Sequence, residues 1–232
     1  MSALFTSPFR VTKKLKILFV GSEAAPFARV GGLASVMYSL PKALSELGYD
    51  ARIMIPRYLS ISDAKYHLHM EHEGLKVPTD NNGNGADHIV CNVKRCEPDT
   101  NGAGVTSYFL ENQEYYEQRA NVYGYADDPI RFTLLSRGVL EFIRQKATWV
   151  PDVIVALDWQ TGLIPNYLKT IYKDDPVLSQ IATNFSIHNL FFQSTFDHHF
   201  VSEMDYDDGH SPVPGFHSER LPKLNMMRRG IM

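Results

Sequence analysis

The residues that most constrain the fold form a strand–loop–helix–strand pattern between residues 15 and 56. Residues 15–20 and 50–56 are short apolar runs that predict two buried strands. Such a unit forms a parallel strand pair with a right-handed crossover. We therefore expect an α/β fold, an open and mostly parallel Rossmann-like sheet with helices on both faces. The helix between the two strands is predicted from apolar residues at helical spacing, before a stop at Gly48: Leu33, Val36, Leu40, Ala43, Leu44 and Leu47.

Two adjacent glycines, Gly31 and Gly32, stand where the chain leaves the first strand and enters the helix. Free backbone N–H groups and the positive end of the helix dipole favour an anion at such a place. Without Cβ atoms, the backbone can be approached closely by a phosphate or a sugar. A plain strand-to-helix turn explains the pair equally well. The sequence contains neither the dinucleotide fingerprint Gly-x-Gly-x-x-Gly nor the P-loop Gly-Lys-Ser/Thr.

Polar residues also follow two later predicted strands. Asp158 comes directly after the apolar run 151–157, and His188 follows a strand that starts near residue 180. Ligands collect at the carboxyl ends of strands in an open parallel sheet, so we expect both side chains on the same rim as the two glycines. The alternatives are that Asp158 caps the next helix and that His188 is a hydrogen-bonded core histidine.

The remaining segments complete the expected fold. Residues 89–96 and 105–110 predict an antiparallel hairpin. Residues 59–88 are polar and turn-rich, and we interpret them as a mobile excursion over the edge of the sheet. Their three histidines suggest a metal site, but no carboxylate partner stands at helical spacing and we expect none. Residues 129–146 predict a helix with one apolar stripe: Phe132, Leu135, Val139, Phe142 and Ile143.

Residues 16–58 resemble the amino-terminal segment of bacterial glycogen synthases and plant starch synthases. The family loop reads Lys-Thr-Gly-Gly-Leu, where this chain has Arg29 followed by Val-Gly-Gly-Leu. Arginine keeps the charge but offers a planar fork in place of a compact ammonium group. Ser35 stands where the family often has an aspartate. Further similarities to the family are Asp-Trp-x-x-Gly-Leu from Asp158, Ile-His-Asn-Leu around His188, Arg119, Tyr123-Gly124 and Arg131-Phe132.

The resemblance implies a retaining glucosyltransferase with the GT-B fold. Such an enzyme moves glucose from ADP-glucose or UDP-glucose to the non-reducing end of an α-1,4-glucan, with no cofactor and no metal. The base pocket that would decide between the two donors lies in the other domain. The implied catalytic residues are His188 and Asp158. The implied substrate-binding residues are Arg29, Gly31, Gly32 and Glu23. The implied acceptor side comprises Tyr115, Tyr123 and Arg119, and core packing is the alternative for its tyrosines and for Tyr116.

The resemblance covers nearly the whole chain, whereas the chain covers only part of such an enzyme. We expect residues 1–13 to be a flexible lead-in and residues 14–232 to be the amino-terminal domain. Its partner is then a second GT-B domain, which carries most of the nucleotide site. Because catalysis by positioning needs both domains, we expect the chain alone to be inactive. The alternative is a non-catalytic glucan-binding or interaction module derived from a synthase.

Charge and composition exclude other classes of protein. A formal net charge of −3 over 232 residues gives no reason to expect nucleic acid or an anionic membrane as partner. No run reaches the roughly 18 apolar residues of a membrane span, and residues 1–14 lack a signal-peptide pattern. Cys91 and Cys96 would point to opposite faces of one strand, which argues against a disulfide. Two thiols without a secretion signal predict a cytoplasmic protein.

Overall fold

The structure is a computed structural model that describes residues 14–80, 86–98, 104–145, 148–194 and 207–232. The predicted lead-in, residues 1–13, lies outside these ranges.

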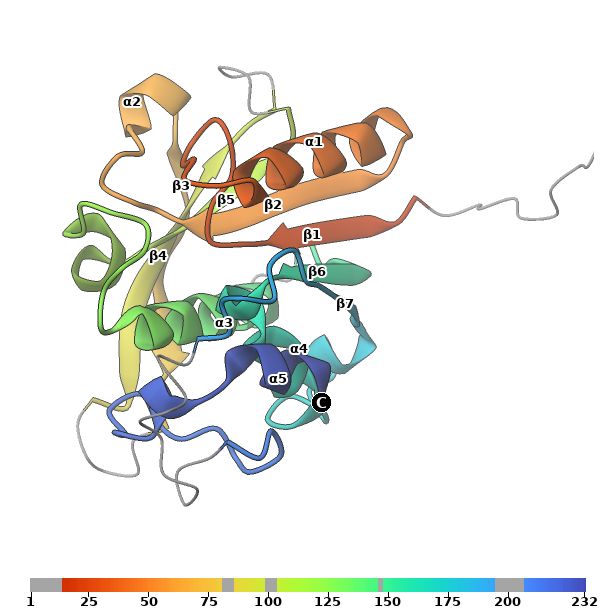
Figure 1. The fold of residues 1–232 in the computed structure, drawn as a ribbon. Coiled ribbons are helices and arrows are strands. Elements are labelled where there is room, and N and C mark those ends of the chain that lie inside the picture. Colours follow the sequence, from red (N-terminus) through yellow and green to blue (C-terminus); the bar gives the residue numbers. More distant parts are fainter. Residues whose placement is uncertain (1–13, 81–85, 99–103, 146–147, 195–206) are drawn as a thin grey trace, which may run out of the picture.

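The described residues form one seven-stranded sheet in the order β3-β4-β5-β2-β1-β6-β7 (Figure 1). Strands β5, β2, β1, β6 and β7 pair in parallel, whereas β4 pairs antiparallel with both β3 and β5. The predicted mostly parallel α/β sheet is therefore confirmed. The strand bounds are β1 (Lys16–Val20), β2 (Asp50–Pro56), β3 (His69–Pro78), β4 (His88–Cys96), β5 (Ser107–Glu111), β6 (Val153–Leu157) and β7 (Ala182–Ser186).

The opening unit β1–α1–β2 forms as predicted. Helix α1 (Leu33–Glu46) follows Gly32, and Gly48 adopts a φ of 92° just beyond its end. That left-handed conformation suits glycine and stops the helix. Not all of the apolar residues that predicted the helix are buried, because Leu40 and Leu47 are 44% and 75% exposed. The buried residues of α1 are Leu33, Met37 and Pro41, which are spaced four positions apart, and Ala34, which follows Leu33.

The prediction of a mobile excursion for residues 59–88 was wrong for much of that stretch. Residues 63–66 form helix α2 (Asp63–Tyr66), and β3 is the edge strand of the sheet. Leu75 and Val77 are buried in the core, while Lys76 between them is exposed. An edge strand tolerates such polar residues, and they discourage pairing with other chains. Within the described ranges, no group of three or more His, Cys, Asp or Glu residues could hold a metal ion.

The predicted hairpin is confirmed as the antiparallel pair β4 and β5. Cys91 and Cys96 both lie on β4, buried and free of a disulfide, in agreement with their spacing. Burial raises the pKa of the Cys91 thiol to about 12, although a hydrogen bond from Asn112 acts against this rise. Cys91 is therefore protonated at neutral pH and is a packing residue.

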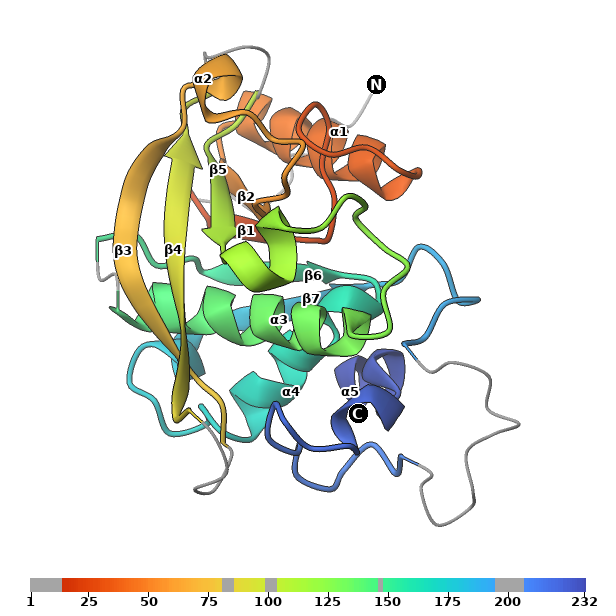
Figure 2. The same cartoon turned by 90° about the vertical axis from the view of Figure 1, so that its left-hand side faces the viewer.

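Helices cover both faces of the sheet, as predicted. Helix α1 lies on one face, and α3 (Asp128–Gln145), α4 (Leu163–Lys169) and α5 (Met226–Ile231) lie on the other (Figures 1 and 2). The predicted helix over residues 129–146 is confirmed, and all five residues of its predicted apolar stripe are buried. Burial extends beyond the stripe, because the helix is buried nearly all round from Asp128 to Ile143. It lies between β3 and α4 and contacts both. In the part of the chain that the structure describes, no helix is long and apolar enough to cross a membrane.

Candidate functional site

The candidate site lies on the rim formed by the carboxyl ends of β1, β6 and β7. These strands are neighbours and run parallel, so the segments that follow them leave the sheet on the same side. The structure places the loop after β1, Asp158 and His188 on this rim, as the sequence predicted. The backbone N–H of Asp158 also donates to the carbonyl of Ser186, at 2.9 Å, which ties two of the strand ends together.

The two glycines of the loop after β1 differ in their surroundings. The Glu23 carboxylate, which is 2% exposed, accepts hydrogen bonds from the backbone N–H groups of Val30 (2.5 Å) and Gly31 (3.0 Å). A Cβ atom added to Gly32, by contrast, would have no neighbouring atom within 4 Å. Gly32 has a φ of −67°, which any residue adopts, so conformation alone does not explain a glycine there. Open space above its backbone leaves room for a ligand.

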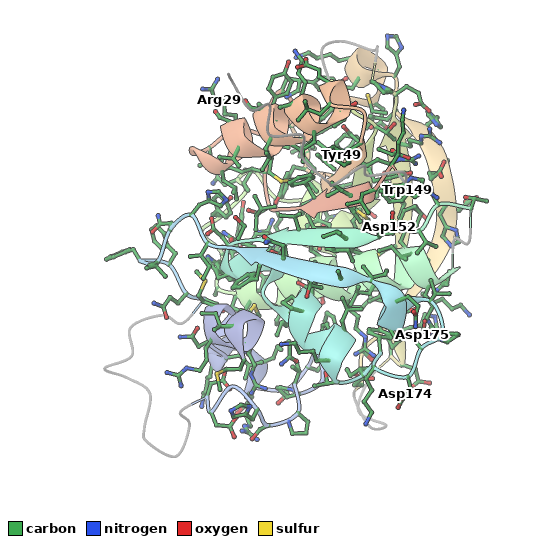
Figure 3. All side chains as sticks on the ribbon, turned by 90° about the vertical axis from the view of Figure 1, so that its right-hand side faces the viewer. Arg29, Tyr49, Trp149, Asp152, Asp174 and Asp175 are labelled. Atoms are coloured by element: carbon green, nitrogen blue, oxygen red, sulfur yellow. The ribbon has the colours of Figure 1, made fainter. Side chains whose placement is uncertain are left out.

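Arg29 is the exposed cation of this loop. Within the described ranges no carboxylate forms an ion pair with it, and its side chain lies at the edge of the molecule in Figure 3. Helix α1 begins three residues after Val30 with no side-chain cap and no acidic residue in its first turn. The guanidinium group and the start of the helix therefore both offer positive charge to solvent.

Asp158 holds the turn that follows β7. Its Oδ1 accepts hydrogen bonds from the backbone N–H groups of His188 (2.7 Å) and Asn189 (3.1 Å), and the residue is 7% exposed. It makes no side-chain cap on the helix that begins at Trp159, so the helix-cap alternative was wrong. Its φ of 57° and ψ of −177° fall in a region that glycine almost alone adopts, which is a strained backbone conformation of the kind found at functional sites.

His188 presents its ring at the surface. The side chain is exposed, so the alternative of a core histidine was wrong. Its Nε2 lies 3.0 Å from the hydroxyl oxygen of Ser186, the last residue of β7. Its backbone N–H is held by Asp158. Ser186 thus contacts the imidazole ring and Asp158 holds the backbone of the same residue, while the side chain is exposed to solvent.

The tyrosines of the predicted acceptor side have different environments. Tyr116 is fully buried in the π-helix η1 (Gln113–Glu117), and its hydroxyl donates to the Arg131 carbonyl at 2.7 Å. Core packing is therefore the correct interpretation for Tyr116, which offers no ring face to a sugar. Tyr115 is half-buried against the core.

Tyr123 connects the acceptor-side segment to the rim. It is half-buried, and its hydroxyl oxygen lies 2.7 Å from the Ser22 hydroxyl. Burial raises the pKa of the Tyr123 hydroxyl well above its ordinary value. The hydrogen bond to Ser22 opposes this rise, and the carboxylates of Glu23 and Asp158 add to it. Tyr123 therefore stays protonated beside two carboxylates of the rim.

Arg119 is engaged within its own segment. Its Nη2 pairs with Asp127 at 2.6 Å, its Nε donates to the Glu114 carbonyl at 3.0 Å, and its guanidinium lies over the Tyr125 ring at 5.1 Å. These contacts all fall between residues 114 and 127. Arg119 thus orders the acceptor-side segment, and none of these contacts reaches the rim.

Sequence reasoning missed three residues that shape the site. Ser22 is fully buried, and its carbonyl accepts the Tyr58 hydroxyl at 2.6 Å, in addition to the contact with Tyr123. Ser186 orients the His188 ring. The three residues are Ser22, Tyr58 and Ser186, and each lies at the carboxyl end of a strand or within two residues of it. The expectation that ligand-binding residues follow parallel strands, which led to Asp158, could therefore also have found them.

Comparison with known proteins decides the family. The family model described as starch synthase catalytic domain matches residues 16–232. The chain belongs to this family. The predicted resemblance is therefore confirmed over nearly the whole chain.

Curated relatives and a solved structure agree with this assignment. A glycogen synthase of Clostridium perfringens is 38% identical over 220 residues, which are 94% of this chain and 43% of that protein. One of Moorella thermoacetica is 33% identical over 228 residues, 96% of this chain and 42% of that protein. The catalytic domain of starch synthase IV from Arabidopsis thaliana, bound to ADP and acarbose, superposes with a TM-score of 0.68. It is 26% identical, with 78% of this chain and 35% of that chain covered. This chain thus spans less than half the length of each.

Proposed function

We propose that the chain is the amino-terminal part of a glucosyltransferase of the glycogen and starch synthase type. It would help move glucose from ADP-glucose, or UDP-glucose, to the non-reducing end of an α-1,4-glucan with retention of the α configuration. The observation that carries the proposal is the rim, in a chain of this family. The segments that follow its strands carry Arg29, which forms no ion pair with any described residue, the open backbone at Gly32 and the exposed side chain of His188. Catalysis would rest on positioning and charge stabilisation.

Arg29 and Gly32 form the proposed donor side. The Arg29 guanidinium and the Gly32 N–H would balance the charge of the departing diphosphate, and charge-assisted hydrogen bonds of this kind are strong. Gly31 and Glu23 would contribute by shaping the loop, because their N–H and carboxylate already engage one another. The Arabidopsis relative was solved with ADP and acarbose, which supports a diphosphate and a sugar-like ligand as the chemistry of this site.

His188 and Asp158 form the proposed reacting side. The exposed ring of His188 would hold the hydroxyl groups of the donor glucose. Asp158 would keep the histidine in place through the backbone of residues 188 and 189. The acceptor glucan would lie against the segment of Tyr115, Arg119 and Tyr123, whose two tyrosine rings are only half-buried.

The proposed enzyme needs a second domain. The curated relatives extend well beyond the matched region, which supports a carboxyl-terminal domain that carries most of the nucleotide site. The chain alone would then lack useful transfer activity. Two cysteines that form no disulfide fit a cytoplasmic location, where glutathione and thioredoxin keep thiols reduced.

A transfer assay tests the proposal. The 232-residue chain and the complete protein of its reading frame are each incubated with radiolabelled ADP-glucose and glycogen. We expect transfer by the complete protein and none by the chain. Turnover by the chain alone near the ordinary range of about 1 to 10³ per second would contradict the need for a second domain. Glycogen binding without transfer by the complete protein would favour the non-catalytic module instead.

Ligand titration tests the division between the two sides. In NMR titrations of the isotope-labelled chain, we expect maltoheptaose to bind at roughly millimolar concentration, about −4 kcal/mol. ADP-glucose should bind more weakly, because Arg29 and the free backbone N–H groups alone would hold it. Shifts with micromolar ADP-glucose and none with maltoheptaose would overturn this assignment of the acceptor side.

A further inference from the structure

Arg131 is a buried arginine that sits beneath the acceptor-side segment. It lies in the first turn of α3 and is fully shielded from solvent. Its Nε donates to the Tyr115 carbonyl at 2.7 Å, and its Nη1 donates to the Val122 carbonyl at 3.0 Å. The fork of a single guanidinium group therefore fastens two peptide units that stand seven residues apart in the chain.

The charge of Arg131 is balanced within the same structure. Its Nη1 pairs with Asp128 Oδ1 at 2.5 Å, and Asp128 is 4% exposed. The other carboxylate oxygen of Asp128 accepts hydrogen bonds from the backbone N–H groups of Gly124 (2.8 Å) and Tyr125 (3.2 Å). The Arg131–Asp128 pair thus also holds the backbone at residues 124 and 125, in addition to the carbonyl groups of Tyr115 and Val122. Removing one member of a buried pair leaves an uncompensated charge, so both residues are needed.

The two carbonyl groups held by Arg131 belong to Tyr115 and Val122. The residue that follows each is a tyrosine that connects the segment to the loop after β1. Tyr116 follows Tyr115 and packs edge-on against Tyr58, whose hydroxyl donates to the Ser22 carbonyl. Tyr123 follows Val122 and hydrogen-bonds the Ser22 hydroxyl. Both contacts therefore end at Ser22, next to the Glu23 carboxylate that shapes the glycine loop.

We propose that Arg131 is a positioning residue that sets the acceptor-side segment, residues 113–125, against the loop after β1. It touches no ligand itself, and it acts through Tyr116 and Tyr123, whose preceding carbonyl groups it holds. The proposal rests on the proposed function for its ligand, because the segment is the proposed glucan side. Its consequence is selective: loosening Arg131 weakens glucan binding and leaves the Arg29 side unchanged.

Arg137 provides the matched control. It lies on the same helix, is 4% exposed and pairs with Asp80 and Tyr172, so its replacement also removes a buried guanidinium. Its contacts with Asp80, Tyr167 and Tyr172 lie outside residues 113–125. Arg137→Lys therefore costs stability in α3 without releasing the acceptor-side segment.

The experiment compares Arg131→Lys with Arg137→Lys in the 232-residue chain, by hydrogen exchange and by NMR titration. We expect Arg131→Lys to raise amide exchange in residues 113–125 on the order of tenfold. The maltoheptaose dissociation constant should also rise about tenfold, with that of ADP-glucose unchanged. Arg137→Lys should change neither. Asp128→Asn, which loosens the guanidinium without removing it, gives the same readouts if Arg131→Lys fails to fold.

Two outcomes would overturn the proposal. One is an equal rise in exchange throughout the chain for both arginine variants, which would make Arg131 an ordinary core residue. The other is unchanged exchange in residues 113–125 in Arg131→Lys and Asp128→Asn. If the unaltered chain binds no maltoheptaose, the proposed glucan side fails, and the exchange comparison still decides whether Arg131 positions the segment.

Discussion

The two ends of the parallel strands differ in whether their polar groups bind other residues or face solvent. At the amino ends of β2 and β6, Asp50 accepts hydrogen bonds from Arg52 (3.0 Å) and from the Trp149 indole (2.7 Å). The Arg52 guanidinium also lies 4.2 Å from the centre of the Trp149 ring. Beside them, Asp152 accepts the backbone N–H of Lys16 at 2.8 Å. Figure 3 shows Trp149 and Asp152 together at this end and Arg29 toward the other.

At the carboxyl ends, key groups face solvent. Arg29 has no ion-pair partner among the described residues, and the His188 ring is held by Ser186 with its other edge free. Paired groups join strands, whereas groups without partners can meet a ligand. Charged residues thus engage one another at one end of the sheet, whereas at the other end, the proposed binding rim, Arg29 and His188 stay accessible to a ligand.

The largest expected effect is at the amino end. Trp149→Ala removes an indole that packs on Arg52 and Tyr108 and donates to Asp50. We expect the free energy of unfolding to fall by about 2–3 kcal/mol, measured by urea denaturation. Trp149→Phe keeps a ring and should lose only about 1 kcal/mol, the value of a hydrogen bond. Equal losses for the two variants would mean that the ring contacts do not matter.

Asp158 tests whether the carboxyl end also stores strain. Asp158→Ala loses the hydrogen bonds to residues 188 and 189 and keeps the unfavourable backbone conformation, so it should cost about 2 kcal/mol. Asp158→Gly loses the same bonds but adopts that conformation freely, and it should recover about 1–2 kcal/mol of the loss. Urea denaturation of both variants measures the difference. Equal stability of the two would contradict the strain.

Acid titration tests the paired state of Asp50. Burial acts to raise the pKa of its carboxyl, but the hydrogen bonds from Arg52 and Trp149 outweigh it and hold the pKa below the ordinary 3.8. A lowered folded pKa adds stability above the unfolded value, and this stability is lost as pH falls through the folded value. We expect the stability difference between the unaltered chain and Asp50→Asn to shrink below about pH 4. A difference that stays constant from pH 6 to pH 2 would contradict the pairing.

The smallest expected effect on stability is at Arg29. Arg29→Ala should change the free energy of unfolding by less than about 0.5 kcal/mol, because the side chain is exposed and forms no ion pair with any described residue. In the complete protein, the same change should lower the transfer rate on the order of 10²-fold, and Arg29→Lys should keep much of the activity. Full activity in the alanine variant would place Arg29 outside the donor site.

The sequence alone determined the sheet class, the β1–α1–β2 unit and the rim. These depend on local signals: short apolar runs, helical spacing, a glycine at the helix end, and polar residues directly after strands. The positions of Asp158 and His188 followed from the same strand-end rule. Each signal lies within a few residues of the feature that it predicts, so no knowledge of distant contacts was needed.

Which residues these features contact depends on the folded structure. Strand β3 was missed because an edge strand needs apolar residues on one face only, and its polar face resembles a loop. The contact of Tyr123 with Ser22 joins residues 101 positions apart, and no local pattern encodes such a pair. The same holds for Arg131, whose residue type suggests a surface position until the fold surrounds it with carbonyl groups and a carboxylate.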